Sequence, residues 1–313
     1  MIYVLNRLVS ILITLLLISA ITFAVVNILP GDVAMMVLGT QSNPAALEGL
    51  RRSLGLYDPL PIQYLHWLGG LVSGHFGSSL MFKTAILPLL LQKMKASALL
   101  VVMSMVFALA CAVPLGVWAA VHRDRWQDST ASGGALLGIS LPDFFWGIML
   151  ILLFARVLGW LPSSGFADPA VDPGAAFAHA LLPSLALGLG LMAHLTRVTR
   201  STMTGILNQE YIRVARAKGL GEGTVVWRYA LANAIGPVMT VAGLQIGYLF
   251  GSIIVVETLF NYTGMGWVTY QALLNRDVPL IQSAIFVIAA IVMLVNFAVD
   301  LLYMAVDPRI RMG

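Results

Sequence analysis

Long apolar runs separated by short polar segments make up most of this 313-residue chain. A helix needs about 20 apolar residues to cross the hydrocarbon core of a bilayer. Six runs reach that length: Leu8–Leu29, Ser97–Val121, Ala135–Leu158, Ala180–Thr199, Ile235–Val256 and Leu280–Met304. The pattern therefore predicts an all-α polytopic membrane protein with about six transmembrane helices.

The polar segment between the first two runs carries helix signals of its own. Asn43 followed by Pro44 is typical of an N-cap and a first helical position. Gly55 can end that helix, and Asp58 with Pro59 can begin a second one. An apolar face beside Trp67 is expected from Ile62, Leu65 and Leu68. We expect a small helical segment at one membrane surface.

Positive charge is concentrated in the connections on one side of the expected spans. The short segment His122–Gly134 carries two arginines, whereas the short loops Gly159–His179 and Glu257–Pro279 contain only Arg276. Most of the remaining cations follow the fourth run or the sixth: Arg197, Arg200, Arg213, Arg216, Lys218, Arg228, Arg309 and Arg311. Because basic loops are retained inside, the polar loop Arg197–Arg228 and both termini are predicted to be cytoplasmic.

Composition excludes a soluble protein and offers little catalytic chemistry. Hydrophobic residues make up 59% and charged residues 10% of the chain, against about a quarter charged in soluble domains. The lysines lie outside any P-loop context, the histidines are scattered, and Cys111 is the one cysteine. We therefore expect no enzyme activity, no metal and no cofactor on this chain.

Ionisable residues inside the apolar runs are few. Asp143 follows Pro142, Glu257 lies at the end of the fifth run, and Asp300 lies near the end of the sixth. Such residues are costly in a membrane, but all three lie near span ends, where capping or pairing between helices is expected. A proton-coupled secondary transporter would need a relay of buried carboxylates, which these residues do not form.

The basic loop itself contains a second pattern. Asn208 is a good N-cap and Glu210 suits the first turn of a helix. Gly219 is placed to end this helix, and a second helix is expected from about Thr224 into the fifth span. Small side chains at Ala215 and Ala217 keep the first helix slim, which would allow another surface to approach closely.

Residues 210–220, E-Y-I-R-V-A-R-A-K-G-L, resemble the cytoplasmic coupling loop of ATP-binding-cassette importer permeases of the dipeptide, oligopeptide and nickel class. The general importer motif has Glu-Ala-Ala and then Gly, whereas Arg213 stands at the Glu position here. The resemblance implies that this loop docks on an ATPase subunit. The implied coupling residues are Glu210, Tyr211, Arg213, Ala215, Arg216, Ala217, Lys218, Gly219 and Leu220.

Further segments resemble the same class in order along the chain. They are Leu29–Asp32, Leu54–Leu60, His75–Leu80, Pro114–Gly116, His122–Arg125, Val256–Phe260, Asn275–Gln282, Val299–Tyr303 and Asp307–Arg311. The resemblance implies a type I ABC importer permease fold. It also implies a first span with a helical extracytoplasmic segment over 1–94, a permease domain over 95–304 with the coupling loop at 200–234, and a cytoplasmic tail at 305–313.

The same resemblance implies a function and a set of partners. The chain would form half of the translocation pathway of an importer for di- or oligopeptides in a bacterial or archaeal plasma or inner membrane. Nickel, a metal chelate or glutathione are alternative solutes, and a stand-alone secondary transporter is the alternative of another class. The implied partners are a second, related permease, two cytoplasmic ATPases that hold ATP and Mg²⁺, and an extracytoplasmic solute-binding protein.

Overall fold

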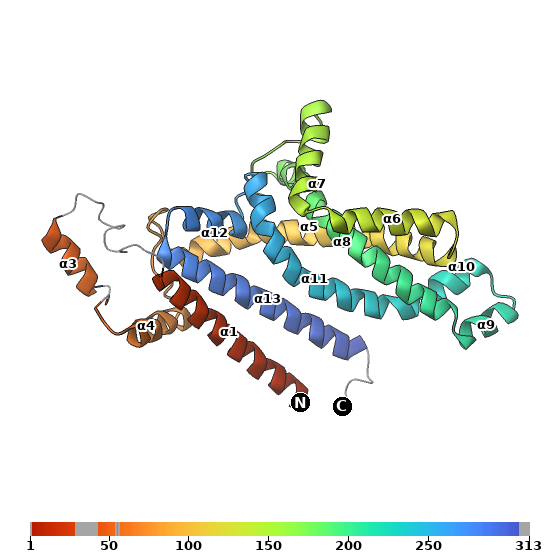
Figure 1. Cartoon of the computed structure of the whole chain (residues 1–313), viewed down its shortest axis with the longest axis horizontal. Helices are drawn as coiled ribbons and strands as arrows, with labels where there is room; N and C mark the ends of the chain where they lie inside the picture. Colours follow the sequence, from red (N-terminus) through yellow and green to blue (C-terminus); the bar gives the residue numbers. More distant parts are fainter. Residues whose placement is uncertain (1, 29–42, 54, 56, 307–313) are drawn as a thin grey trace. The chain divides into compact units, whose positions relative to one another are not determined.

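The computed structural model describes residues 2–28, 43–53, 55 and 57–306, and its regular elements within those ranges are helices (Figure 1). This agrees with the predicted all-α class. The Leu29–Asp32 segment and the basic residues Arg309 and Arg311 lie outside the described residues. The chain divides into two compact units, residues 1–95 with 264–293 and residues 96–263 with 294–313.

The first unit is built on the helices nearest the N-terminus. It holds α1 (Ile2–Ile28), α3 (Pro44–Ser53), α4 (Leu60–Val72) and α12 (Met265–Leu274). The first turns of α5 (Ile86–Val121) and most of α13 (Val278–Val306) complete it. Its core is formed by Val26, Ile86, Leu90, Met265, Val268, Ala272, Leu280, Ile281 and Ala284.

The helices predicted between the first two runs are present. The side chain of Asn43 accepts a hydrogen bond from the Ala45 amide at 3.0 Å, and Gly55 has φ +64°. Ile62 and Leu65 on the predicted apolar face of α4 are 43% and 62% exposed. Tyr64 and Trp67 instead pack on Phe23 of α1, with ring centroids 5.5 and 5.9 Å away, because aromatic rings bury the larger apolar area.

The second unit contains the remaining helices. They are most of α5, then α6 (Trp126–Ser140), α7 (Asp143–Leu150), the π-helical turn η1 (Ile151–Val157), α8 (Pro173–Leu207), α9 (Glu210–Ala217), α10 (Glu222–Thr224), the π-helical turn η2 (Val225–Ala230) and α11 (Leu231–Leu259). Helix α8 packs against α6, α7 and α11. The approach of α6 to α8 is close, since a Cβ added at Gly138 would lie 2.6 Å from the Cβ of Ala193.

Among the described residues, five helices are long and apolar enough to cross a membrane: Val4–Asn27, Ile86–Val121, Pro173–Leu207, Glu222–Leu259 and Val278–Leu301. The predicted third span is a helix pair bent by 101°, Trp126–Ser140 with Asp143–Val157, which passes the same test together and would be the sixth span. Pro142 explains the break, because proline has no amide hydrogen and forces the preceding residue out of the helical region. Leu141 accordingly has φ −98° and ψ 132°.

Two predicted loops are partly helical. Helix α6 begins at Trp126, within the connection predicted over His122–Gly134. Helix α8 begins at Pro173, within the loop predicted over Gly159–His179, because the Asp172 carboxylate caps it by accepting from the Ala175 amide at 2.9 Å. The same helix continues to Leu207, so the first turns of the predicted basic loop belong to a long helix.

Two of the carboxylates noted in the apolar runs join helices, as predicted. The buried Glu257 of α11 accepts a hydrogen bond from the Ser97 hydroxyl of α5 at 2.5 Å. The carboxylate of Asp143, the first residue of α7, is hydrogen-bonded to Ser252 of α11. A carboxylate that is removed from water, fully as in Glu257 or partly as in Asp143, needs such partners, so both residues have structural roles.

Candidate functional site

Helix α9 is a short helix between two long ones. It follows the end of α8 after two residues, and Gln209 occupies the N-cap without a side-chain hydrogen bond. The predicted N-cap role of Asn208 is wrong. Its side-chain amide donates to the Thr204 carbonyl at 2.9 Å and so closes α8, because α8 runs further than the sequence predicted.

The end of α9 is fixed by backbone hydrogen bonds around Gly219. The Gly219 amide donates to the Arg216 carbonyl at 2.9 Å, and the Leu220 amide donates to the Ala215 carbonyl at 3.4 Å. Gly219 has φ +78°. This pair of bonds with a left-handed glycine is the Schellman motif, so Gly219 ends the helix as predicted.

An ion pair crosses the corner that follows. The Arg216 guanidinium donates twice to the Glu222 carboxylate, from Nε at 3.1 Å and from a terminal nitrogen at 2.6 Å. These hydrogen bonds raise the pKa of Arg216 above its usual value. Glu222 is the first residue of the continuous helix Glu222–Leu259. The pair therefore links α9 to that long helix.

One face of α9 is buried. Ile212 is fully buried and Ala215 is 5% exposed. They lie in a cluster, here called the α9 platform, with Val117 and Ala120 at the end of α5, Met203 of α8, and Val225, Val226, Ala230 and Ala234 of η2 and α11. A displacement of α9 would thus move the ends of three long helices, because close-packed side chains transmit strain.

The opposite face of α9 is exposed. Tyr211 and Val214 are 43% and 47% exposed. Arg213 and Glu210 approach within 3.7 Å in a pair whose side chains are both largely in solvent. The structure thus divides the predicted coupling residues. Ala215 lies inside the platform and Arg216 is tied to Glu222. Arg216 is itself exposed, and the other exposed members are Glu210, Tyr211, Arg213, Ala217, Lys218, Gly219 and Leu220.

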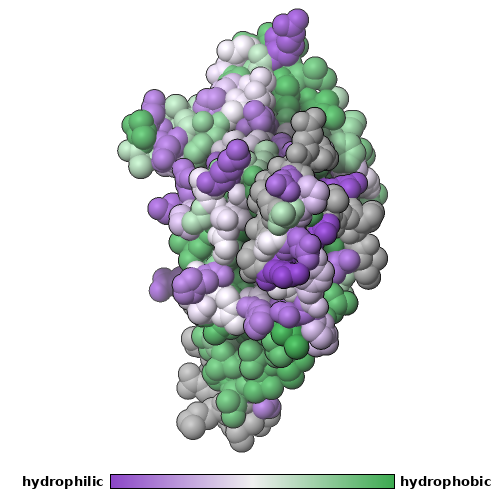
Figure 2. All heavy atoms as spheres, turned by 90° about the vertical axis from the view of Figure 1, so that its left-hand side faces the viewer, coloured by the Kyte–Doolittle hydropathy of each residue, from purple (hydrophilic) through white to green (hydrophobic). Residues whose placement is uncertain are grey.

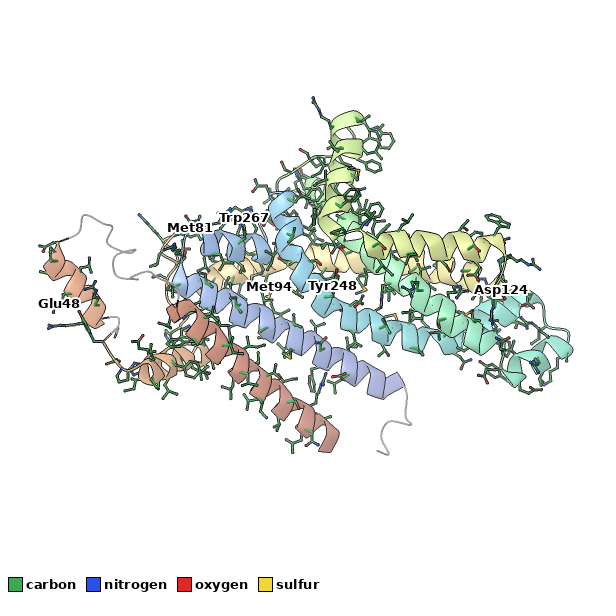
Figure 3. The ribbon with its side chains drawn as sticks, in the orientation of Figure 1. Glu48, Met81, Met94, Asp124, Tyr248 and Trp267 are labelled. Atoms are coloured by element: carbon green, nitrogen blue, oxygen red, sulfur yellow. The ribbon has the colours of Figure 1, made fainter. Side chains whose placement is uncertain are left out.

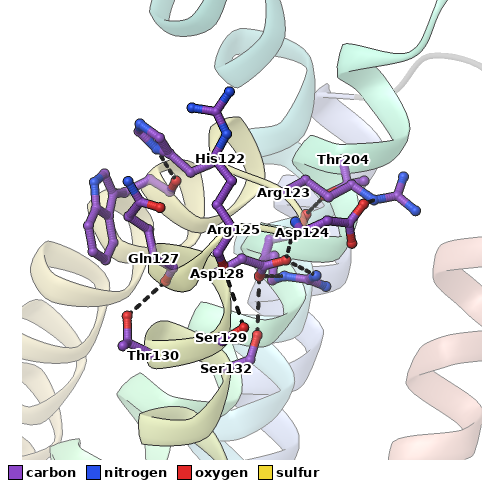
Figure 4. Close-up of polar contacts among 12 residues, drawn as sticks. His122, Arg123, Asp124, Arg125, Gln127, Asp128, Ser129, Thr130, Ser132 and Thr204 are labelled. Atoms are coloured by element: carbon purple, nitrogen blue, oxygen red, sulfur yellow. Dashed lines mark hydrogen bonds and ion pairs between the residues drawn. The ribbon is translucent and has the colours of Figure 1, made fainter.

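A second polar site near the platform was not predicted. Asp128 in the first turn of α6 is 5% exposed and accepts two hydrogen bonds from the Arg200 guanidinium of α8. It also accepts from the Asp124 amide at 3.1 Å and the Ser132 hydroxyl at 3.3 Å (Figure 4). Asp128 and Arg200 lie 72 residues apart in the sequence. The one signal for this pair in the sequence is that Asp128 is an acidic residue close to the basic residues Arg123 and Arg125.

The described residues hold no group of three or more His, Cys, Asp and Glu side chains that could bind a metal. What they do hold is a helical membrane scaffold with an exposed short helix packed on the ends of its long helices. This arrangement defines a polytopic helical membrane protein.

Comparison with known proteins identifies the family. The chain belongs to the family of inner membrane components of binding-protein-dependent transport systems, which matches residues 112–312, and the N-terminal region of these membrane components matches residues 1–85. It is 38% identical over 309 residues to the glutathione transport system permease protein GsiC of Escherichia coli strain K12, covering 99% of this chain and 98% of that protein. The protein of the same name from Salmonella typhi is 37% identical with the same coverage.

A solved structure confirms the fold. A chain of the MetNI methionine ABC transporter in an inward-facing conformation superimposes with a TM-score of 0.59 at 18% identity, over 71% of this chain and 98% of that chain. The chain is therefore a multi-pass inner-membrane permease of an ABC importer, and not an enzyme. Its family works with ATPase and solute-binding subunits, which sets aside the stand-alone secondary transporter.

Proposed function

We propose that α9 is the element through which the ATPase subunits drive this permease. The observation that carries this proposal is the division of α9 into two faces. Ile212 and Ala215 are packed among the ends of α5, α8 and α11, while Tyr211 and Val214 are exposed. A helix of this kind can receive a partner on one side and move three spans on the other.

The connections at both ends of α9 are short and fixed, so a movement of α9 would be passed to the neighbouring helices. Two residues separate α9 from the end of α8. The Schellman motif at Gly219 and the Arg216–Glu222 pair fix the corner that leads into α11. The Arg216–Glu222 pair is exposed, and an exposed ion pair contributes only about 0.5 kcal/mol to stability. The conformation of the corner is therefore stabilised mainly by its backbone hydrogen bonds and by the buried platform.

The mechanism that follows is alternating access. Binding of ATP and Mg²⁺ by the partner ATPases would bring them together and displace α9, and the platform would pass that displacement to the spans. Hydrolysis would reset the pore. The permease itself performs no covalent chemistry and needs only two conformations, each preferred by a different ligand state.

The proposed orientation places α9 and both termini in the cytoplasm. The cations in and around α9 support it: Arg197, Arg200, Arg213, Arg216, Lys218 and Arg228. Basic residues near span ends are retained inside. The α4 helix and the loop before Asp172 then lie outside.

We propose a second, related permease as the other half of the pathway, because one chain supplies only half of a type I translocation path. Di- or oligopeptides are the proposed solutes. The names of the similar permeases support small peptides in particular, since glutathione is itself a tripeptide. A nickel or chelate importer would be identified by the solute that co-purifies with the cognate binding protein, measured by mass spectrometry. Recovery of a metal complex without peptide would exclude the peptide proposal.

The coupling proposal is tested with Ala217→Asp, which places a carboxylate on the exposed face of α9. The complete transporter is reconstituted in proteoliposomes, and solute-stimulated ATP hydrolysis is measured. We expect stimulation to fall to near the basal rate while membrane insertion is unchanged. Gly219→Pro, which disrupts the end of α9, should act in the same direction.

The matched control is Ser129→Asp, which adds the same charge at an exposed position in the first turn of α6, where an acidic residue suits the helix dipole. This variant should retain full stimulation. Full stimulation in both α9 variants would exclude α9 as the coupling element.

A further inference from the structure

A buried carboxylate in the first unit holds an exposed turn in one conformation. Asp277 is 1% exposed. Its carboxylate accepts from the Ser79 hydroxyl at 2.6 Å and from the Met81 amide at 3.0 Å. It also accepts from the Leu280 amide at 3.3 Å, which caps the first turn of α13. The turn before α5 is therefore anchored to the start of α13.

The turn is also closed by its own backbone. The Ser79 amide donates to the Thr84 carbonyl at 2.9 Å, the Lys83 amide to the Ser79 carbonyl at 3.0 Å, and the Ile86 amide to the Gly77 carbonyl at 3.0 Å. Lys83 is held at φ +52°, which few side chains adopt without support. The turn is thus pre-organised.

Five exposed residues belong to the anchored turn or lie within four positions of Asp277, and they are here called the Asp277 patch: Met81, Lys83, Leu273, Leu274 and Arg276. Its apolar members, Met81, Leu273 and Leu274, are 38%, 47% and 61% exposed. The Asp277 amide donates to the Ala272 carbonyl at 2.9 Å and the Arg276 amide to the Leu273 carbonyl at 3.2 Å. The end of α12 is thereby fixed beside the anchored turn.

The Asp277 patch lies beyond the beginnings of two spans. The turn leads directly into α5 at Ile86, and Arg276 and Asp277 lead directly into α13 at Val278. Met81 and Trp267 mark this end of the first unit in Figure 3. Hydrophilic and hydrophobic residues both reach the surface on the side shown in Figure 2. The patch therefore lies outside the apolar spans Ile86–Val121 and Val278–Leu301.

We propose that the Asp277 patch docks the solute-binding protein, through an apolar contact with acidic residues around it. The inference rests on the proposed orientation, in which this end is extracytoplasmic. The family is one of binding-protein-dependent transport systems, and an extracytoplasmic binding protein would meet the permease at this end. Exposed leucines and a methionine beside two cations have the composition of an interaction surface. The pre-organised turn lowers the entropy lost on association.

The test measures docking directly. The complete transporter is reconstituted in nanodiscs, and its affinity for purified, solute-loaded binding protein is measured without nucleotide. Lys83→Glu combined with Arg276→Glu should raise Kd about tenfold or more and weaken its dependence on salt, because these charges steer and orient the partner. Leu274→Ala should raise Kd several-fold with little change in salt dependence.

The matched control is Arg52→Glu, a charge reversal on the exposed side of α3 in the same unit, which should leave Kd unchanged. An unchanged Kd in the Lys83→Glu, Arg276→Glu variant would overturn the proposal, and so would an equal loss in the Arg52→Glu control. A photo-cross-linker at Met81 should capture the purified binding protein, whereas capture of the second permease would also overturn it. Because no nucleotide is present, these results do not depend on whether α9 couples to the ATPases.

Discussion

Asp128 and Arg200 join the start of α6 to the end of α8 through two parallel hydrogen bonds between carboxylate and guanidinium. The carboxylate side chain is 7% exposed and the guanidinium side chain 31%. A bidentate pair of this kind fixes direction as well as distance. It holds the first half of the bent α6–α7 pair to the helix that leads into α9.

Loss of this pair should destabilise the transporter. In Asp128→Ala the Arg200 guanidinium loses both acceptors while it remains partly buried, which costs about 3 kcal/mol for a buried pair. The melting temperature of the purified complex in detergent should therefore fall by several degrees. Glu48→Ala removes the exposed Glu48–Arg52 pair of α3 and should cost less than about 0.5 kcal/mol. Equal shifts in the two variants would contradict a structural role for the buried pair.

The geometry of the pair should matter as well as its charge. Arg200→Lys keeps the positive charge but cannot donate two parallel hydrogen bonds from a planar group. We expect a loss of stability between that of Asp128→Ala and the unaltered protein, measured by the same thermal unfolding. A melting temperature equal to that of the unaltered protein would show that charge alone is sufficient.

Gly219 should be required for its backbone conformation and not for space. Gly219 has φ +78°, and a Cβ there would meet nothing within 4 Å. Gly219→Ala therefore costs about 1 kcal/mol through the left-handed conformation alone. Amide hydrogen exchange in α9 should become about fivefold faster.

The neighbouring glycine provides the control for that measurement. Gly221 also has open space around its Cβ position, but its φ is −61°. Gly221→Ala should leave the exchange of α9 unchanged. If both alanine variants accelerate exchange equally, the Schellman geometry does not hold α9.

The α6–α8 contact should be sensitive to one methyl group. Gly138→Ala places a Cβ 2.6 Å from that of Ala193, so the helices must separate, at a cost of about 1–3 kcal/mol. Gly134→Ala on the same helix meets nothing within 4 Å and should be neutral or slightly stabilising, because alanine is the better helix former. Thermal unfolding of both variants distinguishes the effect of the α6–α8 contact from the effect of helix propensity. Similar melting temperatures would rule out close packing at Gly138.

Single cysteines test the proposed orientation. In a Cys111→Ser background, Gly221→Cys should react with a membrane-impermeant maleimide only in inverted vesicles. Val171→Cys, in the loop before α8 and 84% exposed, should react only in right-side-out vesicles. The opposite pattern at both positions would reverse the topology.

Sequence patterns were sufficient where one local rule decided the structure. The apolar runs predicted six spans, of which five are single long helices, and Asn43 and Gly219 predicted a helix start and a helix end. The predicted third span is bent in the structure because Pro142 breaks an otherwise continuous apolar run, a break that hydropathy alone does not predict. The prediction for Asn208 was wrong because this residue could end one helix or begin the next. The packing of α8 extends that helix, so Asn208 ends it.

Other features depended on contacts that no local pattern contains. Asp128 and Arg200 come from separate helices, and Asp277 anchors a turn 196 residues earlier in the chain. The buried and exposed faces of α9 also follow from tertiary packing. Its residues lie in one basic segment, whose pattern does not show which side chains will be buried. The family resemblance predicted residues 210–220 as a coupling segment, but it did not predict which of their side chains are buried and which are exposed.

The eight-residue length of α9 has a consequence for inhibitor design. Isolated helices shorter than about 12–15 residues are marginal in water, and α9 owes its shape to Ile212, Ala215 and the bonds around Gly219. A synthetic copy of residues 210–217 would thus be mostly unstructured. A peptide meant to compete for the ATPase surface would need a chemical cross-link on its Ile212–Ala215 side to replace the missing support.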